Sequence, residues 1–148
     1  MRLDRIRELG TGADGLAVAV TTRSTGRPRA SVVNAGVVDH PVTGEAMVGF
    51  VSRGAARKLD DLRHRPEITL VFRSGWEWVA AEGTAELAGP DDPLAGLASE
   101  HVPRVLRTVY AAAVGGSPDD WVSLDEPMAA ERHTAVFVRV SRQYPDVT

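Results

Sequence analysis

A hydroxyl, a run of small residues and two cations separate an apolar stretch from an amphipathic one. Residues 50–66 read FVSRGAARKLDDLRHRP, so Ser52 ends the apolar stretch, and Arg57 and Lys58 fall one turn into a predicted helix. Hydroxyl and cationic groups at a helix N-terminus can hold a phosphate, because that end of the helix is itself partly positive. The same residues can instead form an ordinary N-cap on a solvated helix. The local pattern leaves both interpretations open.

A strand and a helix must position these side chains. Residues 46–51 (AMVGFV) are typical of a strand, and residues 54–64 predict a helix with Leu59 and Leu62 as its apolar stripe, stopped by Pro66. Five further strands are predicted over residues 16–22, 29–38, 67–73, 76–87 and 134–140. Three further helices are predicted over residues 1–9, 102–114 and 121–132.

The order of these elements predicts the fold class. Strands that follow one another with few helices between them favour an antiparallel sheet over a parallel one. We therefore expect a mainly β, α+β protein, a six-stranded antiparallel barrel or sandwich with peripheral helices, as one domain over residues 1–148. The step Asn34-Ala35-Gly36 indicates a bulge or a close backbone approach, and residues 141–148 are expected to be loose.

Composition and charge narrow the classes of function. The chain has no cysteine, which excludes a thiolate nucleophile, a disulfide and a Cys-ligated metal. No apolar run approaches the roughly 20 residues of a membrane span, and the first residues lack the apolar core of a secretory signal. We therefore expect a cytoplasmic protein without a membrane partner. A net charge of −3 argues against a nucleic-acid partner.

Cations nevertheless gather around the opening stretch. Between positions 53 and 73 there are six cations and three acids, which suits a site for a small anion. The six cations are Arg53, Arg57, Lys58, Arg63, Arg65 and Arg73. Lys58 is the only lysine in the chain, and an ammonium group is a compact point charge for a phosphate.

Structural roles explain the other motifs better than catalytic or ligand-binding roles do. GTGADG (10–15) has the spacing of a dinucleotide-binding turn but follows a predicted helix and precedes a strand, the reverse of what that turn needs. The four histidines stand alone, so no metal site is expected. The acidic pairs at 91–92 and 119–120 suggest turns and caps. Trp76 and Trp78 would share one strand face, as core cover or as a wall against a planar ring.

Four stretches, taken together, resemble a known family. They are GRPRASVVNAGVV (26–38), VSRGAARKLDDLRHRPEITLVF (51–72), WVAAEGTAEL (78–87) and MAAERHTAVFVRVSRQYP (128–145). In this order they resemble the pyridoxamine 5′-phosphate oxidase-like split β-barrel proteins. Within that family the chain is most similar to the short flavin/deazaflavin oxidoreductases that use coenzyme F420.

The resemblance implies a homodimer with a six-stranded FMN-binding-type split barrel and a cofactor held at the dimer interface. It implies that Ser52, Arg57 and Lys58 hold the cofactor phosphate. The residues that would lie along the ring system are Val32, Val33, Asn34, Phe50 and Val51. Trp78 would reach the pocket of either subunit. Asp61 departs from the asparagine common in relatives, and its carboxylate could pair with Arg57 or Lys58 or weaken the phosphate site.

The resemblance leads to an F420-dependent oxidoreductase that transfers hydride to a small unsaturated substrate. No catalytic proton donor is identified. One alternative is an FMN-dependent oxidase or flavin reductase of the same fold, and another is a non-catalytic carrier or haem-binding barrel. F420 carries a long oligoglutamate tail, so a cationic groove formed by Arg27, Arg29 and Arg53 would favour it over FMN.

Overall fold

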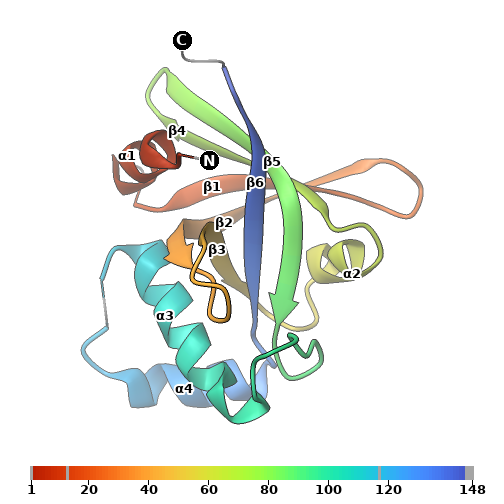
Figure 1. Cartoon of the computed structure of the whole chain (residues 1–148), viewed down its shortest axis with the longest axis vertical. Helices are drawn as coiled ribbons and strands as arrows, with labels where there is room; N and C mark the ends of the chain where they lie inside the picture. The colour runs from red at the N-terminus through yellow and green to blue at the C-terminus, as the bar shows by residue number, and fades with distance from the viewer. Residues whose placement is uncertain (1, 13, 117, 146–148) are drawn as a thin grey trace.

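Six antiparallel strands form a closed barrel in the computed structural model, which describes residues 2–12, 14–116 and 118–145. The strands are β1 (Leu16–Thr22), β2 (Pro28–Asp39), β3 (Ala46–Ser52), β4 (Glu67–Ser74), β5 (Glu77–Ala88) and β6 (Thr134–Tyr144). Around the barrel they follow the order β1-β2-β3-β6-β5-β4. The first three strands form the expected meander, and β6 closes the barrel between β3 and β5 (Figure 1).

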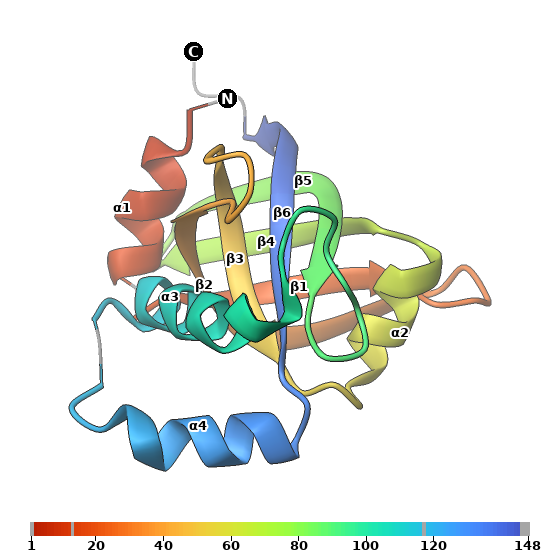
Figure 2. The ribbon, with the colours of Figure 1, turned by 60° about the horizontal axis from the view of Figure 1, so that its bottom comes forward.

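Two helices cover the barrel from opposite sides, and two pack together on its outer face. Helix α1 (Asp4–Gly12) and helix α2 (Arg57–His64) lie on opposite sides of the barrel in both views (Figures 1 and 2). Both contribute buried leucines or isoleucine to the same hydrophobic core as the barrel interior. A short 3₁₀ turn, η1 (Ser99–His101), leads into α3 (Val102–Val114), and α4 (Trp121–Ala130) follows.

The barrel strands carry two hydrophobic clusters because some of them are covered on both faces. Phe50 and Phe72 lie inside the barrel, and Phe137 lies in a second cluster with residues of α3 and α4. Side chains alternate between the faces of a strand, so the start of β6 feeds both clusters and residues 134–138 are all buried. The predicted range of α3, residues 102–114, is the observed one.

The glycine of the Asn34-Ala35-Gly36 step allows a close backbone approach. A Cβ on Gly36 would collide with the main-chain carbonyl of Ala112 in α3, so only glycine fits there. Pairing stays in register between β1, β2 and β3, and the bulge of the sheet lies instead between Glu82 and Gly83, opposite β6. Of the two expected explanations, the close approach is therefore confirmed.

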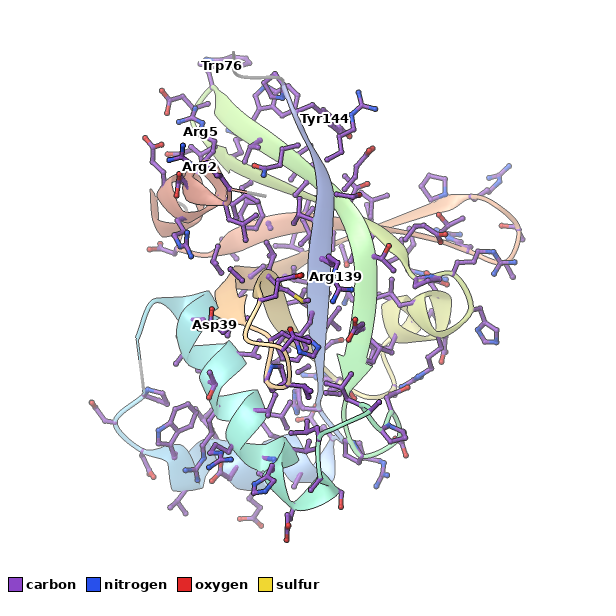
Figure 3. All side chains as sticks on the ribbon, in the orientation of Figure 1. Arg2, Arg5, Asp39, Trp76, Arg139 and Tyr144 are labelled. Carbon is purple, nitrogen blue, oxygen red and sulfur yellow. The ribbon has the colours of Figure 1, made fainter. Side chains whose placement is uncertain are left out.

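Two expectations about the ends of strands are wrong. Residues 141–144 are not loose but continue β6 and pair with β5 beyond its bulge, down to Ala80 opposite Tyr144. Trp76 lies in the turn before β5, where its side chain is 99% exposed, so it does not share a strand face with Trp78. Figure 3 shows Trp76 at the tip of the β4–β5 hairpin, away from the barrel.

Candidate functional site

Ser52 ends β3 at the side of the barrel that α2 covers. Its partner across the ladder is Thr134, the first residue of β6, and its side chain is buried. The Ser52 hydroxyl donates only a long hydrogen bond, 3.4 Å, to the carbonyl of Arg53. Helix α2 begins at Arg57, three residues later than predicted, and its N-cap is Ala56, which has no side-chain cap. Ser52 is therefore not the N-cap of α2, and that part of the simpler interpretation is wrong.

Arg57 and Lys58 open the first turn of this uncapped helix. Arg57 is exposed and Lys58 is half-buried. Neither side chain has a hydrogen-bond or ion-pair partner among the residues that the structure describes. Burial lowers the pKa of Lys58, because removal from water disfavours its charged form. An anion stabilises a half-buried cation beside the positive end of a helix by neutralising its charge, and a phosphate group is such an anion.

Asp61 does not pair with either of these cations, contrary to one expectation. Its carboxylate accepts a hydrogen bond from the Thr21 hydroxyl at 2.8 Å and forms an ion pair with Arg29 at 2.7 Å. Burial by itself raises the pKa of Asp61, but the hydrogen bonds from Arg29 and Thr21 and the nearby guanidinium charge outweigh it and lower the pKa. The carboxylate is therefore ionised and satisfied by the β1–β2 hairpin, and it does not pair with Arg57 or Lys58.

The residues expected along the ring system divide between the two faces of the sheet. Val33 and Phe50 lie inside the barrel core, so only their backbones can face a ligand outside it. Val32 and Asn34 are exposed on the outer face of β2, and Val51 packs against the second hydrophobic cluster. The structure thus brings Val32 and Asn34 to one surface but turns the side chains of their neighbours away from it.

An apolar patch surrounds Val32 on the outer face of β1 and β2. Val32 is 65% exposed, Leu16 49% and Val18 40%. Val18 is the cross-strand partner of Val32, and Leu16 is the partner of Asn34, so these side chains are neighbours on one surface. Contiguous exposed valine and leucine side chains on a sheet are typical of a surface that another molecule covers.

Trp78 lies on β5 next to the end of β6. Its indole is 42% exposed and meets the ring of Tyr144 edge to face, with the ring centroids 6.3 Å apart. The guanidinium of Arg142 lies over the Tyr144 ring, 5.6 Å from its centre. The pair is an aromatic surface at the edge of the sheet, available for stacking but separate from the start of α2.

A cationic cavity of about 550 Å³ lies between α2 and the β1–β2 hairpin. Four arginines and two aspartates line it together with His64, Ser24 and Thr25; the charged residues are Arg23, Arg27, Arg29, Arg65, Asp60 and Asp61. Asp61 is compensated by Arg29, and Asp60 by Arg63, which lies outside the cavity. The side chains of Arg27 and Arg65 have no partner within the described residues. The cavity therefore has a surplus of positive charge.

The sequence identified only part of this cavity. Arg27 and Arg29 were expected to form a cationic groove, but Arg53 lies elsewhere and pairs with Glu131 at 2.7 Å. Arg23 was missed, and Arg65 was counted among the cations near α2 but not placed with Arg27 and Arg29, because the first turn and the end of α2 are far apart in the chain. The one signal in the sequence was the density of arginines in RSTGRPR around the first hairpin.

Three residues of the acidic pairs, Asp91, Asp92 and Asp120, have structural partners, and so does each histidine. Asp91 pairs with Arg132 and Asp92 with Arg63, which ties the loop after β5 to its neighbours. Asp120 caps α4 by accepting hydrogen bonds from two backbone N–H groups, as expected. No cluster of three or more potential metal ligands occurs in the part of the chain described. None of the described helices is both long and apolar enough to cross a membrane.

A closed six-stranded antiparallel barrel with helices over its sides is the split-barrel fold. The family model described as pyridoxamine 5′-phosphate oxidase matches residues 6–125, and the chain belongs to this family. A search of curated protein sequences found no match.

Solved structures support the same fold. A conserved hypothetical protein from Mycobacterium tuberculosis is 17% identical, with a TM-score of 0.67 over 100% of this chain and 91% of its own. An FMN-binding, pyridoxamine 5′-phosphate oxidase-related protein from Nostoc punctiforme is 15% identical, with a TM-score of 0.63 over 95% and 77%. The haem storage protein HutZ from Vibrio cholerae is 13% identical, with a TM-score of 0.58 over 97% and 94%. At such identities the likeness concerns the fold alone.

Proposed function

We propose that the protein is an oxidoreductase that binds a phosphate-bearing flavin or deazaflavin, with coenzyme F420 as the first candidate. The observation that carries this proposal is the half-buried, unpartnered Lys58 at the uncapped start of α2, next to Arg57 and the weakly bonded hydroxyl of Ser52. These groups suit a phosphate in charge and in hydrogen-bonding capacity. Family membership makes such a cofactor the natural source of that phosphate.

The chain's own residues would bind and orient the cofactor. Lys58 and Arg57 would neutralise the phosphate, and Ser52 would donate one hydrogen bond to it. Val32 and Asn34 present an apolar and a polar side chain on the surface next to β1, where a planar ring could lie. When bound, a reduced deazaflavin supplies hydride to a small unsaturated acceptor, and the protein shields the reaction from water.

The cavity between α2 and the β1–β2 hairpin favours F420 over FMN. Residues 57, 61 and 64 are separated by one helical turn each, so Arg57 lies on the same face of α2 as Asp61 and His64, which line the cavity. Asp61 is one helical turn from Arg57, so a phosphate at the start of α2 would be about 6 Å from the cavity along the helix. The surplus arginines there suit the carboxylates of an oligoglutamate tail, which FMN lacks.

A second copy of the chain would complete the site. The apolar patch of Leu16, Val18 and Val32 lies beside Asn34, on the face that the ring system would use. Burying this patch in a homodimer removes apolar surface from water and encloses the ring. In such an assembly, Trp78 of either subunit could reach the partner's site.

Binding titrations of the purified protein with F420, FMN and haem would test the proposal. We expect F420 to bind more tightly than FMN, and Lys58→Ala to weaken F420 binding by about 1–3 kcal/mol, the range for a lost charged hydrogen bond. Arg104→Ala, which removes an exposed cation from α3, should leave affinity unchanged. Equal effects of the two substitutions would remove Lys58 from the site.

Turnover assays distinguish the proposed F420-dependent enzyme from the FMN-dependent and the non-catalytic alternatives. Oxidation of reduced F420 by a panel of unsaturated acceptors is the expected result. Preference for FMN would place the protein among FMN-dependent oxidases or flavin reductases. Tight haem binding without oxidation of either reduced cofactor would indicate a storage or carrier role, consistent with the structural likeness to the haem storage protein HutZ.

A further inference from the structure

A mostly apolar cavity of about 450 Å³ lies between α3, α4 and the loop that joins β5 to α3. These three segments lie on the same side of the barrel (Figure 2). Pockets of this size and apolar character are typical sites for small organic molecules. The apolar lining comes from Pro90, Pro93, Leu94, Leu97, Val102, Pro103, Leu106, Met128 and Ala129.

Three polar side chains line the cavity, those of Ser99, Asp125 and His133, and the imidazole of His133 supplies an acceptor nitrogen. Its Nδ1 lies 3.2 Å from the carbonyl oxygen of Met128. A carbonyl oxygen can only accept, so Nδ1 carries the proton and Nε2 of the neutral ring has a lone pair. No partner for Nε2 exists among the described residues. Buried side-chain polar atoms in that part of the chain all have partners, so Nε2 is open to solvent or a ligand.

The charged groups at the cavity are already compensated. The Asp125 carboxylate lines it and accepts two hydrogen bonds from Arg107, one of them from Nε at 3.0 Å. Arg107 also lies over the ring of Trp121, 5.2 Å from its centre. The guanidinium is thus held by two partners, and no lysine or arginine lines the cavity. An anionic ligand would therefore lose its hydration without meeting a free positive charge.

We propose that this cavity binds a neutral, largely apolar small molecule whose hydroxyl group donates a hydrogen bond to Nε2 of His133. The apolar lining stabilises the body of the ligand, and the acceptor nitrogen of His133 selects a ligand with a donor group. No lysine or arginine lines the cavity to offset the charge of an anion of similar shape. The cavity shares no lining residue with Ser52, Arg57 or Lys58, and the proposal does not depend on which cofactor the protein uses.

Three probes with the same apolar body test this chemistry: 2-naphthol, naphthalene and 2-naphthoate. Amide chemical shifts of the full chain, followed by NMR, give the affinity and the location of each probe. We expect 2-naphthol to bind about two- to ten-fold more tightly than naphthalene, the value of one net hydrogen bond, and 2-naphthoate to bind most weakly. Shift changes should centre on the residues that line the cavity.

Substitutions decide whether the cavity and His133 are responsible. Ala129→Trp places a large ring in the cavity from an exposed position of α4 and should abolish binding of all three probes. His133→Phe should retain naphthalene and remove the preference for 2-naphthol, whereas Ser99→Ala should preserve that preference. Circular dichroism checks that each variant is folded. Unimpaired binding in Ala129→Trp, or 2-naphthoate binding as tightly as 2-naphthol, would overturn the proposal.

Discussion

Replacing Asp61 by asparagine tests the link between α2 and the β1–β2 hairpin. The side chains of Asp61 and Arg29 are 8% and 23% exposed. Loss of one partner from a fully buried ion pair costs about 3–5 kcal/mol, and from an exposed pair about 0–1 kcal/mol. This pair lies between those limits, at the edge of an open cavity where water can solvate Arg29 again. We therefore expect Asp61→Asn to lower the free energy of unfolding by about 2 kcal/mol at neutral pH.

The pH dependence of this effect has a definite sign. The native pKa of Asp61 is lowered, so its stabilisation is present above the pKa of the unfolded chain, about 3.9, and is lost as pH falls through the lower native value. The difference between the wild type and Asp61→Asn should therefore be full at pH 7 and smaller at about pH 3, by urea unfolding at one fixed protein concentration.

The neighbouring residue provides the control. Asp60 is 68% exposed and pairs with Arg63 within α2, so Asp60→Asn should change the free energy of unfolding by less than about 0.5 kcal/mol. A similar loss in both variants, or a difference that does not shrink in acid, would refute the assignment of Asp61 as the ionised anchor of the hairpin.

Three further changes test other parts of the structure. Gly36→Ala should destabilise the protein by about 1–3 kcal/mol, because its Cβ would press on the backbone of α3, and thermal unfolding would detect this. Val32→Asp should shift the proposed homodimer toward monomers in sedimentation velocity, whereas Val122→Asp, at another exposed valine, should not. His40→Ala should cost about 1–3 kcal/mol in urea unfolding, since the ring is buried, bonds Glu86 at 3.0 Å and accepts two backbone hydrogen bonds; an unchanged midpoint would contradict this.

Local patterns in the sequence were sufficient to predict most of the fold. The apolar run that ends at Ser52, the helical spacing of residues 102–114 and the glycine at position 36 each act within a few residues, so the sequence alone predicted the strand, the helix and the close approach. The sequence did not predict that residues 141–144 belong to a strand, because they have no alternation of apolar and polar residues. Their place in β6 comes from pairing with β5, more than fifty residues away in the chain.

The candidate site was less predictable, because its electrostatics depend on contacts between distant segments. The partner of Asp61 is Arg29, on the second strand, rather than a cation one turn away in the same helix. Arg65 and Arg23 share a cavity only because α2 packs beside the first hairpin. The sequence indicated the residue types that an anion site needs, but it could not assign which charges are compensated and which remain free.

The closing position of β6 has a consequence for how the protein folds. Residues 53–133 separate β3 from β6 in the sequence, so these two strands can pair only late. In contrast, β1 pairs with β2 and β2 with β3, which are close in the sequence. Contacts of such long sequence separation slow the search for the native state. During synthesis, β4 can pair with β1 early, but the outer edges of β3 and β5 would stay open until β6 emerges from the ribosome. Those edges are where a chaperone would act, and where a newly made chain is most exposed to aggregation.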